Sequence, residues 1–281
     1  FSNQQLSQKR VEMEAAYLKI YDYFDGDPLL IYVIGGTVIV NINFWLFNLF
    51  FITIDMIDPK WVQPYKIQDE KKPPLSKYLG AFKVILANQF IAGPLITLFW
   101  YFPAVWFGTS FTGPLPSGWQ IFRDIVISIL CEEIGFYYSH RLFHHPKIYK
   151  YIHKKHHEWT APVSITSIYC HPLEHAISNL SPVLLGPTIC GSHVITLWIW
   201  ASIAILSTTC SHSGYHFPFM LSPEPHDYHH KVFNECFGTG LLDWIHGTDS
   251  TFRKSIEGKR NYMSWSMKPI KQIHPEQQKE E

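Results

Sequence analysis

The sequence is poor in charged residues, and neither sign dominates. Lys and Arg total 23 and Asp and Glu total 23, so the formal net charge is zero at pH 7. Charged side chains make up 16% of the chain, against about 25% in a typical soluble domain. The balance excludes a nucleic-acid-binding protein that acts through a strong basic field. The 47% of hydrophobic residues excludes disorder and leaves a large buried core or a membrane.

Several familiar metal and disulfide patterns are missing. The five cysteines are widely spaced and contain no CxxC pair, which excludes a disulfide framework and a thiolate zinc site. We expect them to be small buried side chains in a reducing environment. The sequence has no HExxH motif of metalloproteases and no Glu-x-x-His pattern of carboxylate di-iron bundles.

Four stretches with few charges are long enough to cross a membrane at about 1.5 Å per residue: 29–54, 84–108, 121–138 and 176–210. The second is interrupted at Gly93-Pro94, where we expect a kink or turn. The fourth is split by Gly186-Pro187 and Gly191, which predicts a helical hairpin with one short arm. The predicted fold is an all-α integral membrane protein with about four transmembrane helices, one of them as the hairpin. Buried helices of a soluble protein are the alternative.

Loop charges predict the orientation. Residues 58–77 hold five lysines, residues 103–118 hold no charged side chain, and residues 141–155 are again basic. The positive-inside rule therefore places 58–77, 140–175 and the C-terminal region in the cytosol and 103–118 in the lumen or outside. All histidine clusters then lie on the cytosolic face. The asparagines inside the first stretch, at 41, 43 and 48, are expected to find partners on neighbouring helices.

Histidines are concentrated in the second half of the chain, where fourteen of the sixteen lie between His140 and His230. Ten of them form four clusters with spacings of three or four residues, which would bring imidazoles onto one helical face. Neutral imidazole binds zinc, iron, copper and nickel. Ten ligands are too many for one tetrahedral ion, so the clusters predict a two-metal site: His140, His144, His153, His156, His157, His212, His216, His226, His229 and His230.

The remaining histidines have weaker patterns. His171 and His175 are spaced by four residues, and they are candidates either as ligands or as groups that orient ligands. His145 precedes Pro146 and points away from His144, so we expect it at the surface or beside a ligand. Isolated histidines at 193, 246 and 274 are expected to be ordinary.

Three carboxylates are candidates to orient the ligands. On an ideal helix Glu133 projects within roughly 60° of His140 and His144, so it could accept a hydrogen bond from the far nitrogen of a ligand. Glu132 points elsewhere and needs another partner. Glu174 and Asp227 are the further candidates.

Seven segments together resemble the membrane fatty acid hydroxylase superfamily of histidine-box di-metal oxidases, over roughly residues 30–255. The nearest branch is that of the sterol C4-methyl oxidases and the fatty acid hydroxylase domain-containing proteins. One departure is His216, which stands where the sterol oxidases are expected to have an aspartate and which is typical of fatty acid 2-hydroxylases. The matching segments are 65–68, 140–145, 149–162, 171–174, 212–215, 226–230 and 247–249.

The resemblance implies about four transmembrane helices under a cytosolic helical cap, in the endoplasmic reticulum membrane. It implies two iron ions, which zinc may replace in purified samples, and electrons from NAD(P)H through cytochrome b5 and its reductase. The ten clustered histidines are carried over as ligands, with His216 as the tenth. The expected divisions are a lumenal amphipathic segment, transmembrane helices with a cytosolic loop, the catalytic domain and a polar tail: 1–28, 29–120, 121–255 and 256–281.

The predicted activity is O₂-dependent oxidation of a membrane lipid, with the C4-methyl group of a sterol as the leading substrate. Hydroxylation of a fatty acyl, sphingolipid or alkylglycerol chain is the alternative. A metal-binding or transport protein is more remote, because transporters hold their ligands at mid-bilayer whereas these clusters lie in lysine-rich segments. A regulator that retains the site without activity also stays open. Four lysines dock an acidic electron carrier or anchor the protein on the membrane surface: Lys147, Lys150, Lys154 and Lys155.

Overall fold

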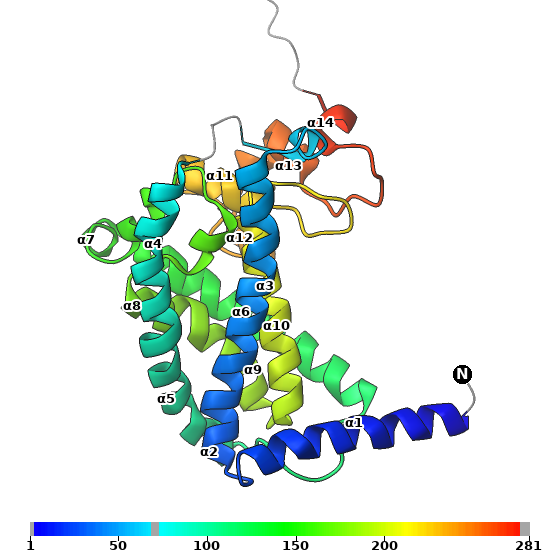
Figure 1. Ribbon diagram of the computed structural model, residues 1–281. Helices are drawn as coiled ribbons and strands as arrows, with labels where there is room; N and C mark the ends of the chain where they lie inside the picture. Colours follow the sequence, from blue (N-terminus) through cyan, green and yellow to red (C-terminus); the bar gives the residue numbers. More distant parts are fainter. Residues whose placement is uncertain (1–2, 69–72, 276–281) are drawn as a thin grey trace, which may run out of the picture.

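The computed structural model describes residues 3–68 and 73–275, and all regular elements in these ranges are helices. Long helices run side by side as a bundle, with short helices gathered at one end and α1 (Asn3–Tyr23) lying across the other (Figure 1). The bundle consists of α2 (Pro28–Leu30), η1 (Ile31–Gly35), α3 (Gly36–Ile57), α4 (Leu75–Ala87), η3 (Asn88–Ala92), α5 (Gly93–Trp106), α6 (Gly118–Phe143), η6 (His175–Leu180), α9 (Ser181–Ile189) and α10 (Val194–Ser211).

Short elements connect and cap the bundle. Between the long helices lie η2 (Gln63–Tyr65), α7 (Pro146–Tyr149), η4 (His153–Glu158), η5 (Ser164–Ile168) and α8 (Pro172–Glu174). After α10 follow α11 (Glu224–Val232), α12 (Leu241–His246), η7 (Phe252–Lys254), α13 (Ile256–Arg260) and α14 (Ile270–Ile273). The cap that these later helices form covers the end of the bundle where α6 and α10 terminate (Figure 1).

Within the described residues, three helices are long and apolar enough to cross a membrane: Pro28–Ile57, Leu75–Trp106 and Val194–Ser211. The all-helical fold is therefore confirmed, with three helices that are candidates to span a membrane. The predicted hairpin is present as α9, with nine residues, and α10, with eighteen. The helix α6 also has the length, but it carries Arg123, Asp124, Glu132 and Glu133. A total of about four spans stays a prediction.

The second predicted span differs from expectation. Residues 75–106 form one continuous helix, which begins before the predicted residue 84. Of the two expectations for Gly93-Pro94, a kink or a turn, the turn is therefore wrong. A π-helical turn, η3, comes directly before these residues. Proline has no N–H to donate and crowds the preceding turn, and a wider turn accommodates both effects without ending the helix.

Contacts at the two ends agree with the predicted sidedness of the loops relative to one another. At one end the Tyr17 hydroxyl of α1 donates to the carbonyl of Phe111 at 2.7 Å, so α1 and the uncharged loop 103–118 lie together. At the other end Lys66 pairs with Tyr215 in an isolated bridge. The basic loop therefore lies beside the histidine that ends α10, His212.

Close contacts between helices, α6 with α9 and α3 with α10, hold the bundle together. A Cβ atom at Gly186 of α9 would lie 2.4 Å from Cα of Ser128 in α6, so only glycine permits this approach. Across the α3–α10 contact, Asn43 donates to the hydroxyl of Ser202 at 2.7 Å, as predicted for an intramembrane asparagine. Asn41 and Asn48 instead donate to carbonyls one turn earlier in their own helix.

Candidate metal centre

Nine of the ten histidines predicted as ligands lie in two compact groups, at the end of the bundle where α6 and α10 terminate. Within each group the candidate ligand nitrogens lie within 4.8 Å of one another. Group one contains His140, His144, His153, His157 and His229, and group two contains His156, His212, His226 and His230.

Each HxxHH box contributes to both groups. In η4 the first and last histidines belong to group one and the middle histidine belongs to group two, and in α11 this assignment is reversed. The end of α6 adds two histidines to group one, and the residue after α10 adds one to group two. The groups are direct neighbours, because the ring centroids of His157 and His230 are 4.6 Å apart.

Distances between ring nitrogens fit two metal ions. Neighbouring Nε2 atoms within a group are 2.9 to 3.3 Å apart, for example 3.0 Å between His140 and His153 and 2.9 Å between His212 and His226. A metal with bonds of about 2.1 Å to imidazole nitrogen separates adjacent ligand atoms by roughly 3.0 to 3.4 Å. The donor set is all imidazole, which suits iron, zinc, copper and nickel.

Backbone carbonyls fix the orientation of four of these rings. A carbonyl only accepts hydrogen bonds, so the Nδ1 atom that contacts it carries the proton, and the Nε2 lone pair faces the group. The N···O distances run from 2.7 to 3.3 Å, with Phe237 for His140, Glu235 for His229, Thr208 for His212 and Tyr169 for His156. The ligand lone pairs are thus directed inward by the fold itself.

One carboxylate contacts a ligand ring directly. Oε1 of Glu174 lies 2.8 Å from Nδ1 of His153, and both side chains are buried. A carboxylate at the far nitrogen fixes the ring and makes its other nitrogen a better metal ligand. Glu174 therefore lies close enough to act on His153, and its role as a ligand-orienting group stays a prediction.

The electrostatics of the site favour neutral imidazoles. Burial lowers the pKa of His156 to about 4 and, with the charge of His156, the pKa of His212 to about 3. Burial and the neighbouring histidines hold the pKa of His229 and His230 well below the ordinary value. Because only neutral imidazole binds a metal, both groups are in the ligand form at neutral pH.

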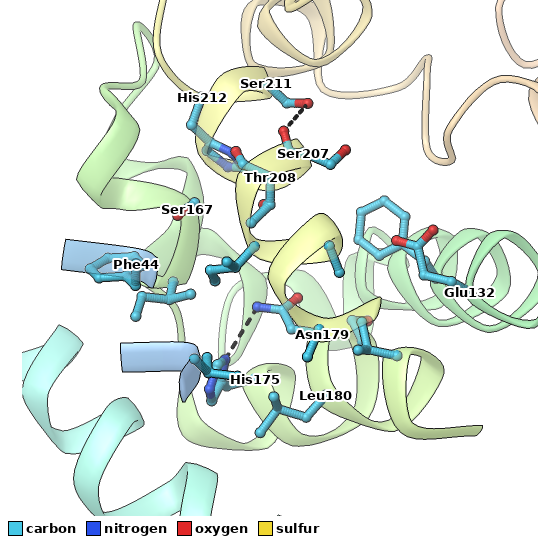
Figure 2. Close-up of a pocket in the computed structure, with 18 of the residues that line it drawn as sticks. Phe44, Glu132, Ser167, His175, Asn179, Leu180, Ser207, Thr208, Ser211 and His212 are labelled. Carbon is cyan, nitrogen blue, oxygen red and sulfur yellow. Dashed lines mark hydrogen bonds between the residues drawn. The ribbon is translucent and has the colours of Figure 1, made fainter. Parts of the chain in front are cut away.

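A cavity of about 460 Å³ reaches both groups from within the bundle. Its walls come from α3, α6, α10 and the π-turns η3 and η6, and five ligand candidates border it: His140, His153, His156, His212 and His226. Figure 2 shows Ser207, Thr208 and Ser211 along α10 beside His212, with His175 and Asn179 farther from it. A lipid in this cavity would have one end at the histidines.

The structure corrects the role expected for Glu133. Its carboxylate accepts hydrogen bonds from the backbone N–H groups of Thr239 and Leu242, at 2.7 and 2.6 Å, and from the Thr239 hydroxyl. It contacts the loop that follows Phe237 rather than a ligand ring. The Phe237 carbonyl orients His140. Glu133 therefore supports group one indirectly, by holding the loop that follows Phe237.

His216 lies apart from both groups. Its Nε2 is 3.0 Å from the carbonyl of Tyr262, and its Nδ1 is 3.7 Å from Oε1 of Glu224. The helix α10 ends at Ser211, with His212 as its C-cap, and the chain is irregular afterwards, so the spacing of four residues does not put these two histidines on one helical face. Asp227, the third candidate carboxylate, accepts from the Gln68 amide at 2.7 Å.

The other six histidines also lie outside the two groups. His145 is exposed and caps α7 by accepting from Lys147, as expected of a surface residue. His171 caps α8 in the same way, whereas His175 is buried and lines the cavity. The isolated histidines have contacts outside both groups: His193 caps α10, and His246 and His274 contact Tyr138 and Tyr262.

Sequence reasoning missed a polar pair inside the second span. Asn88 donates to the carbonyls of Ile168 and Cys170 at 2.9 and 3.0 Å, and so it holds the segment whose Tyr169 carbonyl orients His156. The signal was present, because Asn88-Gln89 is a polar dipeptide within an apolar run.

Comparison with known proteins agrees with this architecture. The family model described as Fatty acid hydroxylase matches residues 125–248. Fatty acid hydroxylase domain-containing protein 2 of Homo sapiens is 38% identical over 95% of this chain and 81% of its own length. Methylsterol monooxygenase 2-2 of Arabidopsis thaliana is 32% identical over 81% of this chain and 89% of its own length.

A third relative carries a different name. Very-long-chain aldehyde decarbonylase GL1-11 of Oryza sativa subsp. indica is 34% identical over 69% of this chain and 78% of its own length. No solved structure matches the chain. The paired histidine groups, the apolar bundle and similarity along almost the whole sequence lead to one conclusion: the chain belongs to the fatty acid hydroxylase family.

Proposed function

We propose that this protein is an O₂-dependent membrane lipid oxidase that hydroxylates the C4-methyl group of a sterol at a histidine-ligated di-iron centre. The observation that carries the proposal is the pair of inward-facing histidine groups bordering a cavity within an apolar bundle. Attacking an unactivated C–H bond requires an oxidant that side chains cannot supply. The relative named methylsterol monooxygenase supports the choice of substrate.

The chain's own residues have defined tasks in this proposal. The nine histidines of groups one and two are the ligands, and Glu174 and the backbone carbonyls orient them. Two iron ions bound there would supply the reduction of O₂ and the oxidation of the C–H bond. In the overall reaction one oxygen atom enters the lipid as a hydroxyl group and the other leaves as water, with two electrons and two protons consumed.

The electrons are proposed to come from NAD(P)H through cytochrome b5 and its reductase. Lys147 and Lys150 are exposed on the segment between α6 and η4, and Lys154 is exposed in η4; there they would attract an acidic carrier domain. The proposed location is the endoplasmic reticulum membrane with the histidines on the cytosolic side. The lysines of the adjacent loop 58–77 support that orientation.

Hydroxylation of an acyl chain is the competing proposal, and His216 was its main support. That support is weakened, because the His216 ring contacts Tyr262 and Glu224 instead of either histidine group. The relatives carry both kinds of name, so lipid analysis must separate the two.

The test is mass-spectrometric profiling of membranes that express the chain and are supplied with a 4,4-dimethyl sterol. We expect the sterol to disappear and its hydroxymethyl or carboxyl product to form. His229→Ala should abolish the product, whereas His145→Ala, at an exposed histidine outside both groups, should retain it. An unchanged sterol pool with new hydroxylated acyl lipids would replace the proposal by the alternative. Product from the His229→Ala variant would contradict the ligand assignment.

A further inference from the structure

Two π-helical turns of the bundle, η3 and η6, are in contact with each other and both line the cavity. Such turns are rare and are found frequently at functional sites. Here they bring Asn88 and Gln89 from one helix to the same cavity as His175 and Asn179 from another. Hydrogen bonds within the protein account for Nδ2 of Asn88 but not for the amide of Gln89, so the presence of Gln89 in an apolar bundle needs its own explanation.

Gln89 is a buried amide without a partner. Its side chain is 7% exposed and lines the cavity, yet neither Oε1 nor Nε2 has a hydrogen-bond partner among the described residues. The Oδ1 atoms of Asn88 and Asn41, which border the same cavity, are also unpaired there. Buried polar atoms are nearly always paired, and lipid tails offer no partner. A bound group would supply the missing hydrogen bonds.

The unpaired atoms define the chemistry of that group. The Gln89 amide offers both a donor and an acceptor, and the two Oδ1 atoms are acceptors. A hydroxyl matches this set, because it accepts from Nε2 of Gln89 and donates its one hydrogen to one of the acceptor oxygens. Among the described residues, the cavity lining contains no Lys or Arg, whereas Glu132 and Glu174 belong to it. A carboxylate or phosphate would therefore enter without a cationic side chain to pair with, at high cost.

These amides are linked to group two by one short segment. The Nδ2 atom of Asn88 holds the carbonyls of Ile168 and Cys170, and the carbonyl of Tyr169 between them orients His156. The polar end of a bound lipid thus lies beside the segment that positions a ligand.

We propose that Gln89, with Asn88 and Asn41, forms a hydroxyl-binding subsite that selects uncharged, hydroxylated lipids over lipids with an anionic head group. Gln89 is the specificity-determining residue of this subsite. The inference rests on the proposed function, because it concerns the substrate of the same site, but its test needs no turnover.

The experiment measures binding of tritiated lipids to the purified full chain in detergent at pH 8, by scintillation proximity. Octadecanol and octadecanoate serve as probes because they differ only at the head group. We expect octadecanol to bind at least about tenfold more tightly, and Gln89→Leu to weaken octadecanol about tenfold while leaving octadecanoate unchanged, as loss of one or two neutral hydrogen bonds predicts. Phe90→Leu, on the same turn with a 58% exposed side chain, should change neither.

Equal binding of the two probes, preference for octadecanoate, or an unaffected Gln89→Leu variant would overturn the subsite. If Gln89→Leu does not fold, as judged by thermal unfolding, Gln89→Met makes the same test with an unbranched side chain. The two proposals fail separately. A 4,4-dimethyl sterol that is not oxidised, together with Gln89-dependent binding of octadecanol, would refute the sterol function and leave the subsite standing.

Discussion

Groups one and two share η4 and α11 but differ in number and in support. Group one has five histidines, and a buried carboxylate, Glu174, lies 2.8 Å from one of them. Group two has four histidines, and two of them, His212 and His156, have their Nδ1 atoms in contact with the neutral carbonyls of Thr208 and Tyr169. Three of the four members of group two border the cavity, against two of the five in group one.

The two groups are expected to differ in how tightly they hold a metal ion and in how accessible that ion is from the cavity. Five imidazoles leave less room around an ion for other ligands than four do, and a carboxylate at the far nitrogen strengthens a ligand. We therefore expect group one to retain its metal more tightly than group two. Group two has fewer ligands and faces the cavity, so we expect it to be the side at which O₂ and lipid approach.

The largest expected effect comes from removing one ligand from each group. We expect His229→Ala and His226→Ala each to reduce oxidase activity below detection and to lower the metal content from about two ions per chain to about one, because the other group keeps its own ligands. Inductively coupled plasma mass spectrometry of the purified variants measures the content. His216→Ala is the matched control and should keep both ions. Two ions retained in His226→Ala would show that group two is not a metal site.

A smaller effect is expected from the carboxylate that distinguishes group one. Glu174→Gln keeps the shape of the side chain but removes the carboxyl group beside Nδ1 of His153, and it should weaken metal binding in group one by about 10- to 100-fold. Competition with a chelator, followed as two phases of metal release, separates the groups. Glu257→Gln, which removes a carboxylate paired with Lys231 on the outside of α11, should leave both phases unchanged. An effect confined to the group-two phase would reverse the comparison.

The histidines that gather in the two groups were largely predictable, but their division between the groups was not. Spacings of three and four residues put the histidines of each box on one side of the chain, and this holds even where η4 is a 3₁₀ rather than an α-helix. Which group each ring joins depends on the ends of α6 and α10, which approach η4 from elsewhere in the sequence. The residues within one histidine cluster therefore do not determine which group each ring joins.

Two errors have simple geometric causes. Projection down an ideal helix places Glu133 beside His140, but seven residues separate them by about 10 Å along the axis, which is beyond hydrogen-bond reach. For His216 the helix has already ended at Ser211, so its period no longer applies. His140 and His229 are oriented by the backbone carbonyls of Phe237 and Glu235. Every residue has a backbone carbonyl, so the sequence does not show which ones make these contacts.

The smallest expected effect is the pH dependence of the stability of the metal-free protein. In metal-free protein the pKa of His156, in group two, is lowered to about 4 by burial, and that of His144, in group one, to about 2 by burial and its neighbours. An unfolded chain has histidine pKa values near 6.5. Between pH 6.5 and 4 the unfolded state therefore binds protons that the folded state does not, and the free energy of unfolding falls as the pH falls.

Chelator-treated protein should accordingly unfold at a lower temperature at pH 5 than at pH 7, by on the order of 5 °C, with tryptophan fluorescence as the probe. His156→Gln removes one such group and should reduce the difference, whereas His145→Gln, at an exposed histidine, should not. A Tm that is the same at both pH values would mean that the metal-free groups open and accept protons. In that case, bound metal rather than the fold would hold the imidazoles inward, and the contrast between the two groups would exist only in the loaded protein.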